Sequence, residues 1–519
     1  MLGKIHYLTR LIFLLTSACI FSAASVSSAE EPRPVASNAK LERRVHELEA
    51  IVQRLQEDLR KSNSAGATTM SAAPGTIGAP PSNVESVLGN SVRPGGAPTL
   101  ANEAPGASAA PTRDGSTAHI PAGWDNGFFI QSEDKTYSLR ITGQIQGDYR
   151  EFVRSGDTTD IDNFLVRRAR LGIEATVAKF YEFRLLPDFG QASPTIQDAY
   201  LNIHYWDEFQ IEIGKFKQPL SYEQLIQDRF VPTVERSIID QLVPARDEGL
   251  MLHGQKLFGD RLDYAFAVSN GEINGSTDVN DSKDVSARIV VRPFVGWESF
   301  PLARGVQIGV SGGGGIEQES ISPASLKTPG TVPWFSYNST VRADGHRTRL
   351  SPEASYFYHS LGLAAQYYRE EQQMRPNSSG AAAKLLVDVP MNGFYVMGTY
   401  LITGEERTSY SQAIVPRANF DPCHPFSCPG AWEAVARVSH LELGEEVFAP
   451  GMARLADPTR FAKGATELTL GFNWYFNPWV RAQFNWEHSW FESAVRLGSG
   501  STGLLNSQDA LLTRLQVIF

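Results

Sequence analysis

The sequence predicts an all-β protein: a 16-stranded transmembrane antiparallel β-barrel over residues 124–519, preceded by a short N-terminal coiled coil and a disordered linker. Three observations predict this fold. Apolar and polar residues alternate in one segment after another, aromatic residues cluster where these segments end, and the chain stops on an aromatic residue. Alternation with period two is typical of a strand that is apolar on one face and wet on the other.

The last eleven residues give the clearest example of this alternation. Leu511, Leu515 and Phe519 share one face of the predicted strand, and Arg514 and Gln516 share the other. A C-terminal Phe on the apolar face is typical of the closing strand of a bacterial outer-membrane barrel. The alternative is an edge strand of a soluble sheet, and the rest of the chain decides between the two.

Composition excludes two broad classes of protein. The chain has 519 residues with a formal net charge of −10, whereas a nucleic-acid-binding protein is normally basic, so we expect no nucleic-acid partner. Hydrophobic residues make up 42% and the mean hydropathy is −0.23, which argues against a bundle of membrane-spanning helices. Aromatic residues at 10% and 44 glycines suit a β-protein with many turns.

Residues 1–29 have the pattern of a secretory signal peptide. Lys4 and Arg10 give a positive start, an apolar run follows, and Ala29 supplies a small residue before the cleavage point. Lipoprotein processing at Cys19 is an alternative, but the apolar run continues past this cysteine.

Residues 38–61 predict a coiled coil, and residues 62–120 predict a disordered linker. The linker is rich in Ala, Gly, Pro, Ser and Thr and has no periodic apolar pattern. The coiled coil covers under three heptads, so it should form by association with copies of itself or with a periplasmic or cell-wall partner. A solvated helix without a partner is the alternative. The heptad seam consists of Leu41, Val45, Leu48, Val52, Leu55 and Leu59.

Two-faced segments then continue to the C-terminus. Their polar faces carry Arg, Glu and Asn rather than only Ser and Thr, which suits a water-filled lumen. Arg167 interrupts the apolar face of one segment near its end, where we expect it at the membrane interface. The predicted strands are 137–150, 165–177, 180–188, 196–206, 207–216, 247–257, 260–270, 283–294, 304–317, 345–358, 361–371, 391–403, 431–441, 464–476, 478–491 and 508–519.

The connections between these segments alternate between short and long. With both chain ends in the periplasm, the short connections become periplasmic turns and the long ones extracellular loops, as in outer-membrane barrels. The turn near residue 477 is flanked by Trp474 and Trp479, as expected for an aromatic girdle. One connection does not fit this alternation: residues 404–430 are assigned to the periplasmic side, yet they are long. Either a strand nearby is misplaced, or this segment folds against the barrel or into its mouth.

Five stretches of the chain resemble the phosphate-selective porin O and P family, and together they span most of residues 125–519. This resemblance implies a 16-stranded outer-membrane porin, usually trimeric, in which a long loop after the fifth strand narrows the pore. Here that loop is 217–248. The stretches are 164–172 (FLVRRARLG), 198–216 (DAYLNIHYWDEFQIEIGKF), 401–407 (LITGEER), 430–443 (GAWEAVARVSHLEL) and 470–481 (LGFNWYFNPWVR).

A porin of this kind would pass small anionic or polar solutes. An ion in a low-dielectric tube loses hydration, and inward-facing arginines restore part of that energy by charge-assisted hydrogen bonds. The basic residues of the constriction loop are Lys217, Arg229, Arg236 and Arg246. The candidate pore-lining arginines are Arg140, Arg168, Arg170, Arg184, Arg288, Arg292, Arg437, Arg481 and Arg514.

Carboxylates on the same faces offer another interpretation of these arginines. They could pair with the arginines across strands and simply line the wall. The constriction loop also lacks a dense lysine cluster and contains six carboxylates, so general or weakly selective diffusion is favoured over phosphate selectivity. The loop carboxylates are Glu223, Asp228, Glu235, Asp240, Asp247 and Glu248.

Cys423 and Cys428 are the two cysteines of the predicted mature chain. An even pair in an oxidising compartment predicts a disulfide closing a small loop. His424 between them allows a metal site as the alternative, but two cysteines and one histidine are an incomplete ligand set, so we expect no metal. No motif typical of an enzyme or of cofactor binding stands out.

Two functions therefore remain in view. The first is a passive outer-membrane channel. The second is an envelope tether, in which the coiled coil and linker reach a partner and the barrel is an anchor. The valines of the heptad seam favour a dimer, but we expect a homotrimer, because contacts between barrels should bury more surface than so short a seam.

Overall fold

The computed structural model describes residues 121–153, 161–191, 194–271, 278, 280–377, 379–497 and 503–519. The predicted signal peptide (1–29), coiled coil (38–61) and linker (62–120) lie outside these residues. None of the helices in the described ranges has the length and apolar composition needed to cross a membrane.

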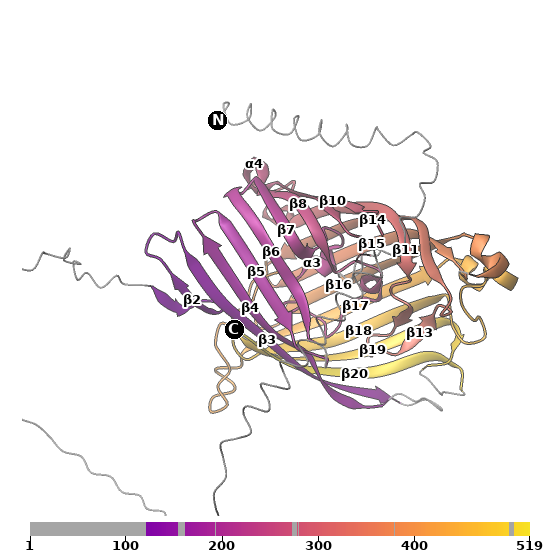
Figure 1. Ribbon diagram of the computed structural model, residues 1–519. Coiled ribbons are helices and arrows are strands. Elements are labelled where there is room, and N and C mark those ends of the chain that lie inside the picture. Colours follow the sequence, from indigo (N-terminus) through magenta and orange to yellow (C-terminus); the bar gives the residue numbers. More distant parts are fainter. Residues whose placement is uncertain are drawn as a thin grey trace, which may run out of the picture. The chain divides into compact units, whose positions relative to one another are not determined.

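Sixteen antiparallel strands form a closed ring, as the alternation predicted (Figure 1). Each strand pairs with the next along the chain, and β20 pairs with β3, from Asp509 opposite Val153 to Ile518 opposite Gln144, so the sheet has no free edge. The strands are β3 Ser138–Val153, β4 Asn163–Val177, β5 Tyr181–Asp188, β6 Thr195–Trp206, β7 Phe209–Lys217, β8 Arg246–Lys256, β9 Leu262–Ser269, β10 Asp284–Val291, β11 Val306–Ser320, β14 Arg342–Tyr358, β15 Leu361–Arg375, β16 Val387–Leu401, β17 Ala431–Leu443, β18 Gly464–Tyr475, β19 Val480–Val495 and β20 Leu505–Ile518.

The two faces of β20 separate as the sequence predicted. Leu511 and Leu515 are 41% and 53% exposed on the outside of the barrel. Arg514 and Gln516 are buried inside it. Burying the charged face and exposing the apolar face inverts the usual arrangement of a water-soluble protein, and it matches a barrel surrounded by lipid.

The C-terminus is fixed where the ring closes. The Phe519 backbone N–H and carbonyl both bond to Gly143 in β3, at 2.9 and 2.6 Å. A side chain at Gly143 would collide with the Phe519 ring, since a Cβ there would lie 2.0 Å from it. The Phe519 ring also contacts Trp124, which lies in the short hairpin β1 (Ala122–Trp124) and β2 (Phe128–Gln131) beside β3. Phe519, the last residue of the chain, therefore contacts both β3, the first strand of the ring, and the hairpin that precedes it.

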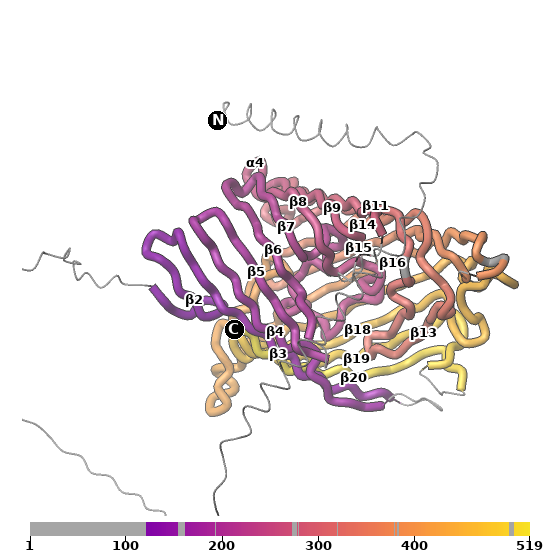
Figure 2. Tube along the Cα trace, in the orientation of Figure 1, coloured from indigo at the N-terminus to yellow at the C-terminus, as the bar shows by residue number. Residues whose placement is uncertain are grey.

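The connections confirm the predicted alternation of short and long. We call the end that holds the turns 178–180, 207–208 and 359–360 the turn end, and Phe519 lies there. We call the opposite end the loop end (Figure 2). Its long connections are 218–245, 321–341, 444–463 and 496–504.

Two connections at the turn end depart from this alternation, 292–305 and the longer 402–430. Only the second was expected. Residues 402–430 contain no strand, so no strand was missed here. The first part of this segment folds inward, whereas residues 422–427 are exposed. Arg407 and Tyr410 are buried, with the guanidinium of Arg407 4.9 Å from the Tyr410 ring centre. Ile414 packs in a small apolar cluster with Leu401 of the barrel wall.

Short elements occupy the remaining connections. They include two helices of one turn, a small hairpin at the loop end, and several 3-10 turns. These are α3 Tyr222–Leu225, α4 Leu257–Asp260, β12 Ser325–Lys327, β13 Pro333–Ser336, η1 Ile238–Gln241, η2 Pro301–Ala303, η3 Gly380–Lys384, η4 Glu445–Phe448 and η5 Gly451–Ala453.

A charge on the outer face tests the membrane assignment. Val438 lies mid-strand in β17 and is 41% exposed. Val438→Arg should lower the free energy of unfolding by about 2–4 kcal/mol, because the arginine would face hydrocarbon. Urea unfolding in lipid vesicles measures the change. Val438→Leu is the control and should cost under about 1.5 kcal/mol. Equal effects of the two variants would contradict a lipid-facing position.

Candidate functional site

The connection between β7 and β8 folds into the barrel. We call residues 218–245 the inner loop; they form most of the predicted constriction loop 217–248. Arg437 in β17 donates to Thr233 Oγ1 and to the Glu235 carbonyl, each at 2.9 Å. Val234 N–H donates to Asn485 Oδ1 in β19 at 2.6 Å. The inner loop is therefore bonded to the far wall of the barrel.

Backbone carbonyls of the inner loop are satisfied by side chains of that wall. Pro232 O accepts from Asn473 at 2.9 Å and from Gln483 at 3.1 Å. Val231 O accepts from Arg481 at 3.1 Å. A buried carbonyl without a partner is costly, so these wall residues supply the bonds that a loop lacks.

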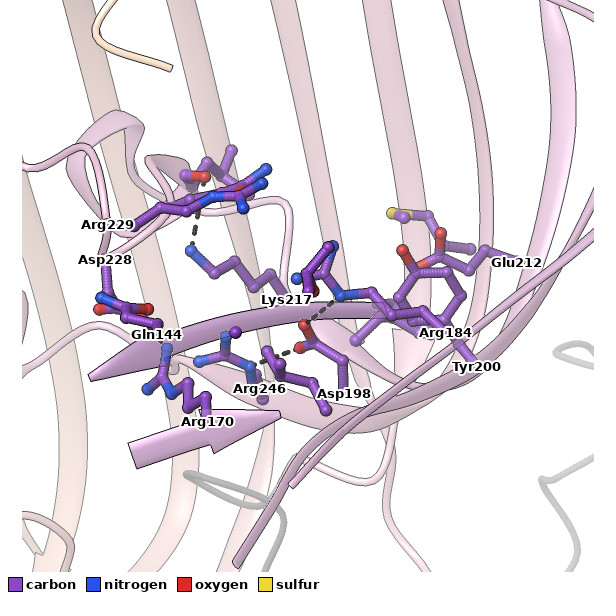
Figure 3. A pocket seen from close by; sticks show the side chains of 17 residues that line it. Gln144, Arg170, Arg184, Asp198, Tyr200, Glu212, Lys217, Asp228, Arg229 and Arg246 are labelled. Atoms are coloured by element: carbon purple, nitrogen blue, oxygen red, sulfur yellow. Dashed lines mark hydrogen bonds and ion pairs between the residues drawn. The ribbon is translucent and has the colours of Figure 1, made fainter. Parts of the chain in front are cut away.

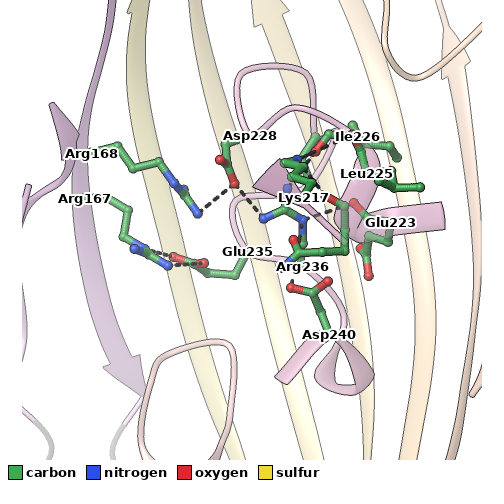
Figure 4. A network of polar contacts seen from close by, with 12 residues as sticks. Arg167, Arg168, Lys217, Glu223, Leu225, Ile226, Asp228, Glu235, Arg236 and Asp240 are labelled. Atoms are coloured by element: carbon green, nitrogen blue, oxygen red, sulfur yellow. Dashed lines mark hydrogen bonds and ion pairs between the residues drawn. The ribbon is translucent and has the colours of Figure 1, made fainter. Parts of the chain in front are cut away.

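Asp228 is a carboxylate of the inner loop that pairs with three arginines (Figure 4). It forms ion pairs with Arg168 at 3.2 Å, with Arg170, and with Arg236 at 2.6 Å. Burial alone would raise the pKa of Asp228, but the attraction of these three arginines outweighs it and holds the pKa well below its usual value. Asp228 therefore holds the loop to β4 as a carboxylate.

Glu235 binds a second set of wall arginines. Its carboxylate pairs with Arg150 at 2.9 Å, Arg167 at 2.7 Å and Arg514 at 3.4 Å. Burial would raise the pKa of Glu235, and the nearby arginines lower it overall. Arg514 also forms a bidentate pair with Asp148, at 2.7 Å for both bonds.

The position of Arg167 corrects the sequence interpretation. We expected it on the apolar face at the membrane interface, but it points into the lumen, where it meets Glu235 (Figure 4). The pairing of β3 with β4 shifts register between Gln146 and Gly147, so one extra residue of β4 is inserted here. Such a bulge breaks the strict alternation of faces on which the expectation rested.

Lys217, at the end of β7, binds backbone carbonyls in the first part of the inner loop. Its ammonium donates to the carbonyls of Gln224 at 2.6 Å and Ile226 at 2.9 Å, with Leu225 at 3.5 Å. The three donors of the ammonium are thus occupied by the protein. Lys217 acts as a local brace for the turn that contains α3.

The connection 321–341 also folds inward at the loop end. Its hairpin residues Trp334 and Phe335 are buried, and Trp334 stacks on Phe491 of β19. Arg150 donates to the Gly330 carbonyl at 3.2 Å. Inward-folded segments thus narrow the barrel from the loop end and the turn end.

A cavity of about 260 Å³ remains between the inner loop and the wall formed by β3 to β8 (Figure 3). It is lined by residues of the wall and of the inner loop, and its charged groups are of both signs. The basic residues are Arg170, Arg184, Lys217, Arg229 and Arg246, and the acidic residues are Asp198, Glu212 and Asp228.

Comparison with known proteins fits this arrangement. The family described as "Phosphate-selective porin O and P" matches residues 139–296 and 334–519, more than half of the chain. The chain belongs to this family. Porin O of Pseudomonas aeruginosa is 23% identical over 455 residues, which cover 79% of this chain and 94% of Porin O. The chain is thus a bacterial outer-membrane porin.

Two solved structures of low sequence identity match about three quarters of the chain. OmpT of Vibrio cholerae is 10% identical, with a TM-score of 0.46 over 74% of this chain and 98% of OmpT. The outer-membrane channel DcaP of Acinetobacter baumannii is 10% identical, with a TM-score of 0.46 over 75% of this chain and 99% of DcaP.

Not every predicted arginine of the porin lines the cavity. Of the thirteen basic candidates, Arg170, Arg184, Lys217, Arg229 and Arg246 line it. Three others pair elsewhere on the wall: Arg140 with Asp125 at 3.7 Å, Arg288 with Glu353, and Arg292 with Asp263. The remaining five, which hold or belong to the inner loop, are Arg168, Arg236, Arg437, Arg481 and Arg514.

The sequence interpretation missed a second cluster of inward arginines. Arg347 and Arg349 of β14 both pair with Asp284, at 2.7 and 3.0 Å, and Arg349 also pairs with Glu370 at 3.1 Å. The sequence did contain a signal for them: Arg347 and Arg349 lie two residues apart within the predicted strand 345–358, so both must face the same side.

The predicted disulfide is absent: Cys423 and Cys428 are free thiols in the structure, and Cys423 is exposed. Backbone bonds hold this loop instead. The Asp421 N–H donates to the Cys428 carbonyl at 3.0 Å, and the Cys428 N–H donates to the His424 carbonyl at 2.9 Å. The turn is thus closed without a covalent link. Within the described ranges, no cluster of three metal-binding side chains occurs.

Removing the charge of Asp228 should loosen the inner loop. Asp228→Asn removes a carboxylate that pairs with three buried arginines, Arg168, Arg170 and Arg236, so the free energy of unfolding should fall by about 3–5 kcal/mol. Single-channel currents should become larger and noisier as the loop moves. Asp240→Asn is the control at pH 7, because among the described residues one arginine, Arg236, contacts Asp240, at 4.0 Å. Equal losses in the two variants would contradict a special role for Asp228.

Asp240 should make stability depend on pH. Burial raises its pKa to about 7 in the folded protein, against an ordinary value of 3.8, and Arg236 does not offset this. The folded state therefore binds the proton more tightly, so the stability from this group is complete below pH 3.8 and is lost as the pH rises to about 7. Asp240→Asn should gain stability relative to the wild type across this window. Urea unfolding at several pH values measures the difference, and a constant difference would disprove the shift.

Proposed function

We propose that this porin allows passive diffusion of small hydrophilic solutes, with at most a weak preference for anions, and that the inner loop narrows its pore. The observation that carries this proposal is the charged cavity between the inner loop and the wall of β3 to β8. Protein groups of both signs line this space, so it replaces part of the hydration of a polar solute.

The pairing of the arginines supports weak rather than strong anion selectivity. Arg246 is 2.6 Å from Asp198, and Arg184 is 3.1 Å from the same carboxylate. Arg170 pairs with Asp188 at 2.7 Å and with Asp228. A cation that is already paired offers a passing anion less attraction than a free one, because the two charges largely cancel at a distance.

The orientation of the barrel in the membrane and its oligomeric state are further parts of this proposal. We propose that the turn end faces the periplasm, because outer-membrane barrels have short periplasmic turns, and that residues 1–120 precede the barrel on that side. We also propose a homotrimer, because contacts between barrels would bury more surface than the predicted seam of 38–61.

Planar-bilayer recording under a KCl gradient tests the channel. We expect open channels with a reversal potential shifted slightly towards the chloride equilibrium, and only weak block by phosphate. Strong block by phosphate would instead establish phosphate selectivity. Folded protein that carries no current would overturn the channel proposal.

An envelope tether is the second candidate function. The predicted coiled coil and linker favour it, since neither is needed for a barrel, and the inward-folded segments would then plug the lumen. Deletion of residues 30–120 separates the two functions. A channel keeps its conductance after the deletion, whereas a tether loses attachment of the outer membrane to the layer beneath, measured by release of membrane vesicles.

A further inference from the structure

We infer that the cavity beside the inner loop binds zwitterionic solutes whose two charges lie apart, such as short peptides, with the ammonium group at Glu212 and the carboxylate at Arg229. This inference rests on the proposed channel function and names the solute class that the cavity prefers.

Glu212 is a buried carboxylate that lines the cavity without a hydrogen bond from the described residues. It lies in β7 and is 8% exposed. The nearest basic atom is His253 Nε2 at 4.0 Å, which lies 3.3 Å from Asn202 Oδ1. A carboxylate taken from water without a partner is costly, so a solute ammonium that reaches Glu212 gains the interaction that the protein does not supply.

Arg229 is the complementary group on the inner loop. Its Nε donates to Gln227 Oε1 at 2.8 Å, and its guanidinium lies 4.9 Å from the Phe230 ring centre. Among the described residues, no carboxylate forms an ion pair with it. Its terminal nitrogens are therefore left for a solute carboxylate, which a guanidinium can bind by two parallel hydrogen bonds.

The other charged groups of the cavity already have protein partners. Asp198 is paired with Arg184 and Arg246, and Asp228 is paired with Arg170. Lys217 donates to three carbonyls of the inner loop. In the described part of the chain, Glu212 and Arg229 are thus the one carboxyl group and the one guanidinium group of the cavity without an ionic partner closer than 4.0 Å.

Glu212 and Arg229 lie at opposite sides of the cavity, with Lys217 and Arg184 between them (Figure 3). A simple anion would satisfy Arg229 and leave Glu212 unpartnered, and a simple cation would do the reverse. A zwitterion with separated charges satisfies both. The cavity volume of about 260 Å³ lies below the roughly 300–1,000 Å³ of sites for drug-sized ligands, which suits a small solute.

Current block in a planar bilayer tests this inference with the full-length protein. The probes are glycine, 4-aminobutyrate and 6-aminohexanoate, in which the separation of the two charges increases. Each is compared with the carboxylate and the amine of equal chain length. We expect a longer zwitterion to block at a concentration about tenfold or more below that of either single-charge analogue.

Charge-neutral variants identify the groups responsible. Glu212→Gln and Arg229→Gln should each remove the preference for the zwitterion. Glu182→Gln and Arg375→Gln are the matched controls, because neither residue lines this cavity; Glu182 bonds to Asn202 and His204, and Arg375 pairs with Asp344. Both controls should keep the preference.

The outcomes distinguish this inference from the channel proposal. Open channels in which no zwitterion blocks better than its analogues would overturn the inference and leave the channel intact. Equal loss of block in Glu212→Gln and Glu182→Gln would show a general charge effect and would also overturn it. Absence of any current would overturn both proposals.

Discussion

The interior of this porin depends on ion pairs between two carboxylates of the inner loop and the arginines of the barrel wall. Asp228 and Glu235 hold the loop against β4, β3 and β20. A sixteen-stranded ring is too wide for its own side chains to fill, so it leaves room for segments of the connections to fold inward. These segments bring polar backbone groups into the barrel interior, and long polar side chains of the wall donate hydrogen bonds to their carbonyls.

We propose that this pairing limits the selectivity of the channel for anions. Arginines that would attract anions along an open lumen are bound instead to carboxylates or to loop carbonyls, as Arg437 and Arg481 are. Structural stability and anion recognition thus compete for the same side chains. We propose that the remaining discrimination falls to Glu212 and Arg229, which line the cavity beside the inner loop.

Most of the barrel could be predicted from the sequence, because each strand carries its own alternating pattern and needs no distant information. The inward position of Arg514 followed directly from that pattern, and so did the outward position of Leu511. The prediction failed for Arg167: its break in the alternation was visible, but a bulge in β4 depends on the register with β3, which the sequence of one strand does not show. The disulfide predicted between Cys423 and Cys428 is not formed in the structure, where both cysteines are free.

The number of strands, their two faces and most of the alternation of short and long connections follow from the sequence alone, because these are local properties of spacing. Which arginine meets which carboxylate depends on the tertiary fold. The path of the inner loop across the lumen brings Asp228 to Arg168 and Glu235 to Arg150, residues about 60 and 85 positions apart in the chain. Such pairings depend on barrel closure and loop docking. The same docking leaves Glu212 and Arg229 facing the cavity, which neither residue type nor spacing could reveal.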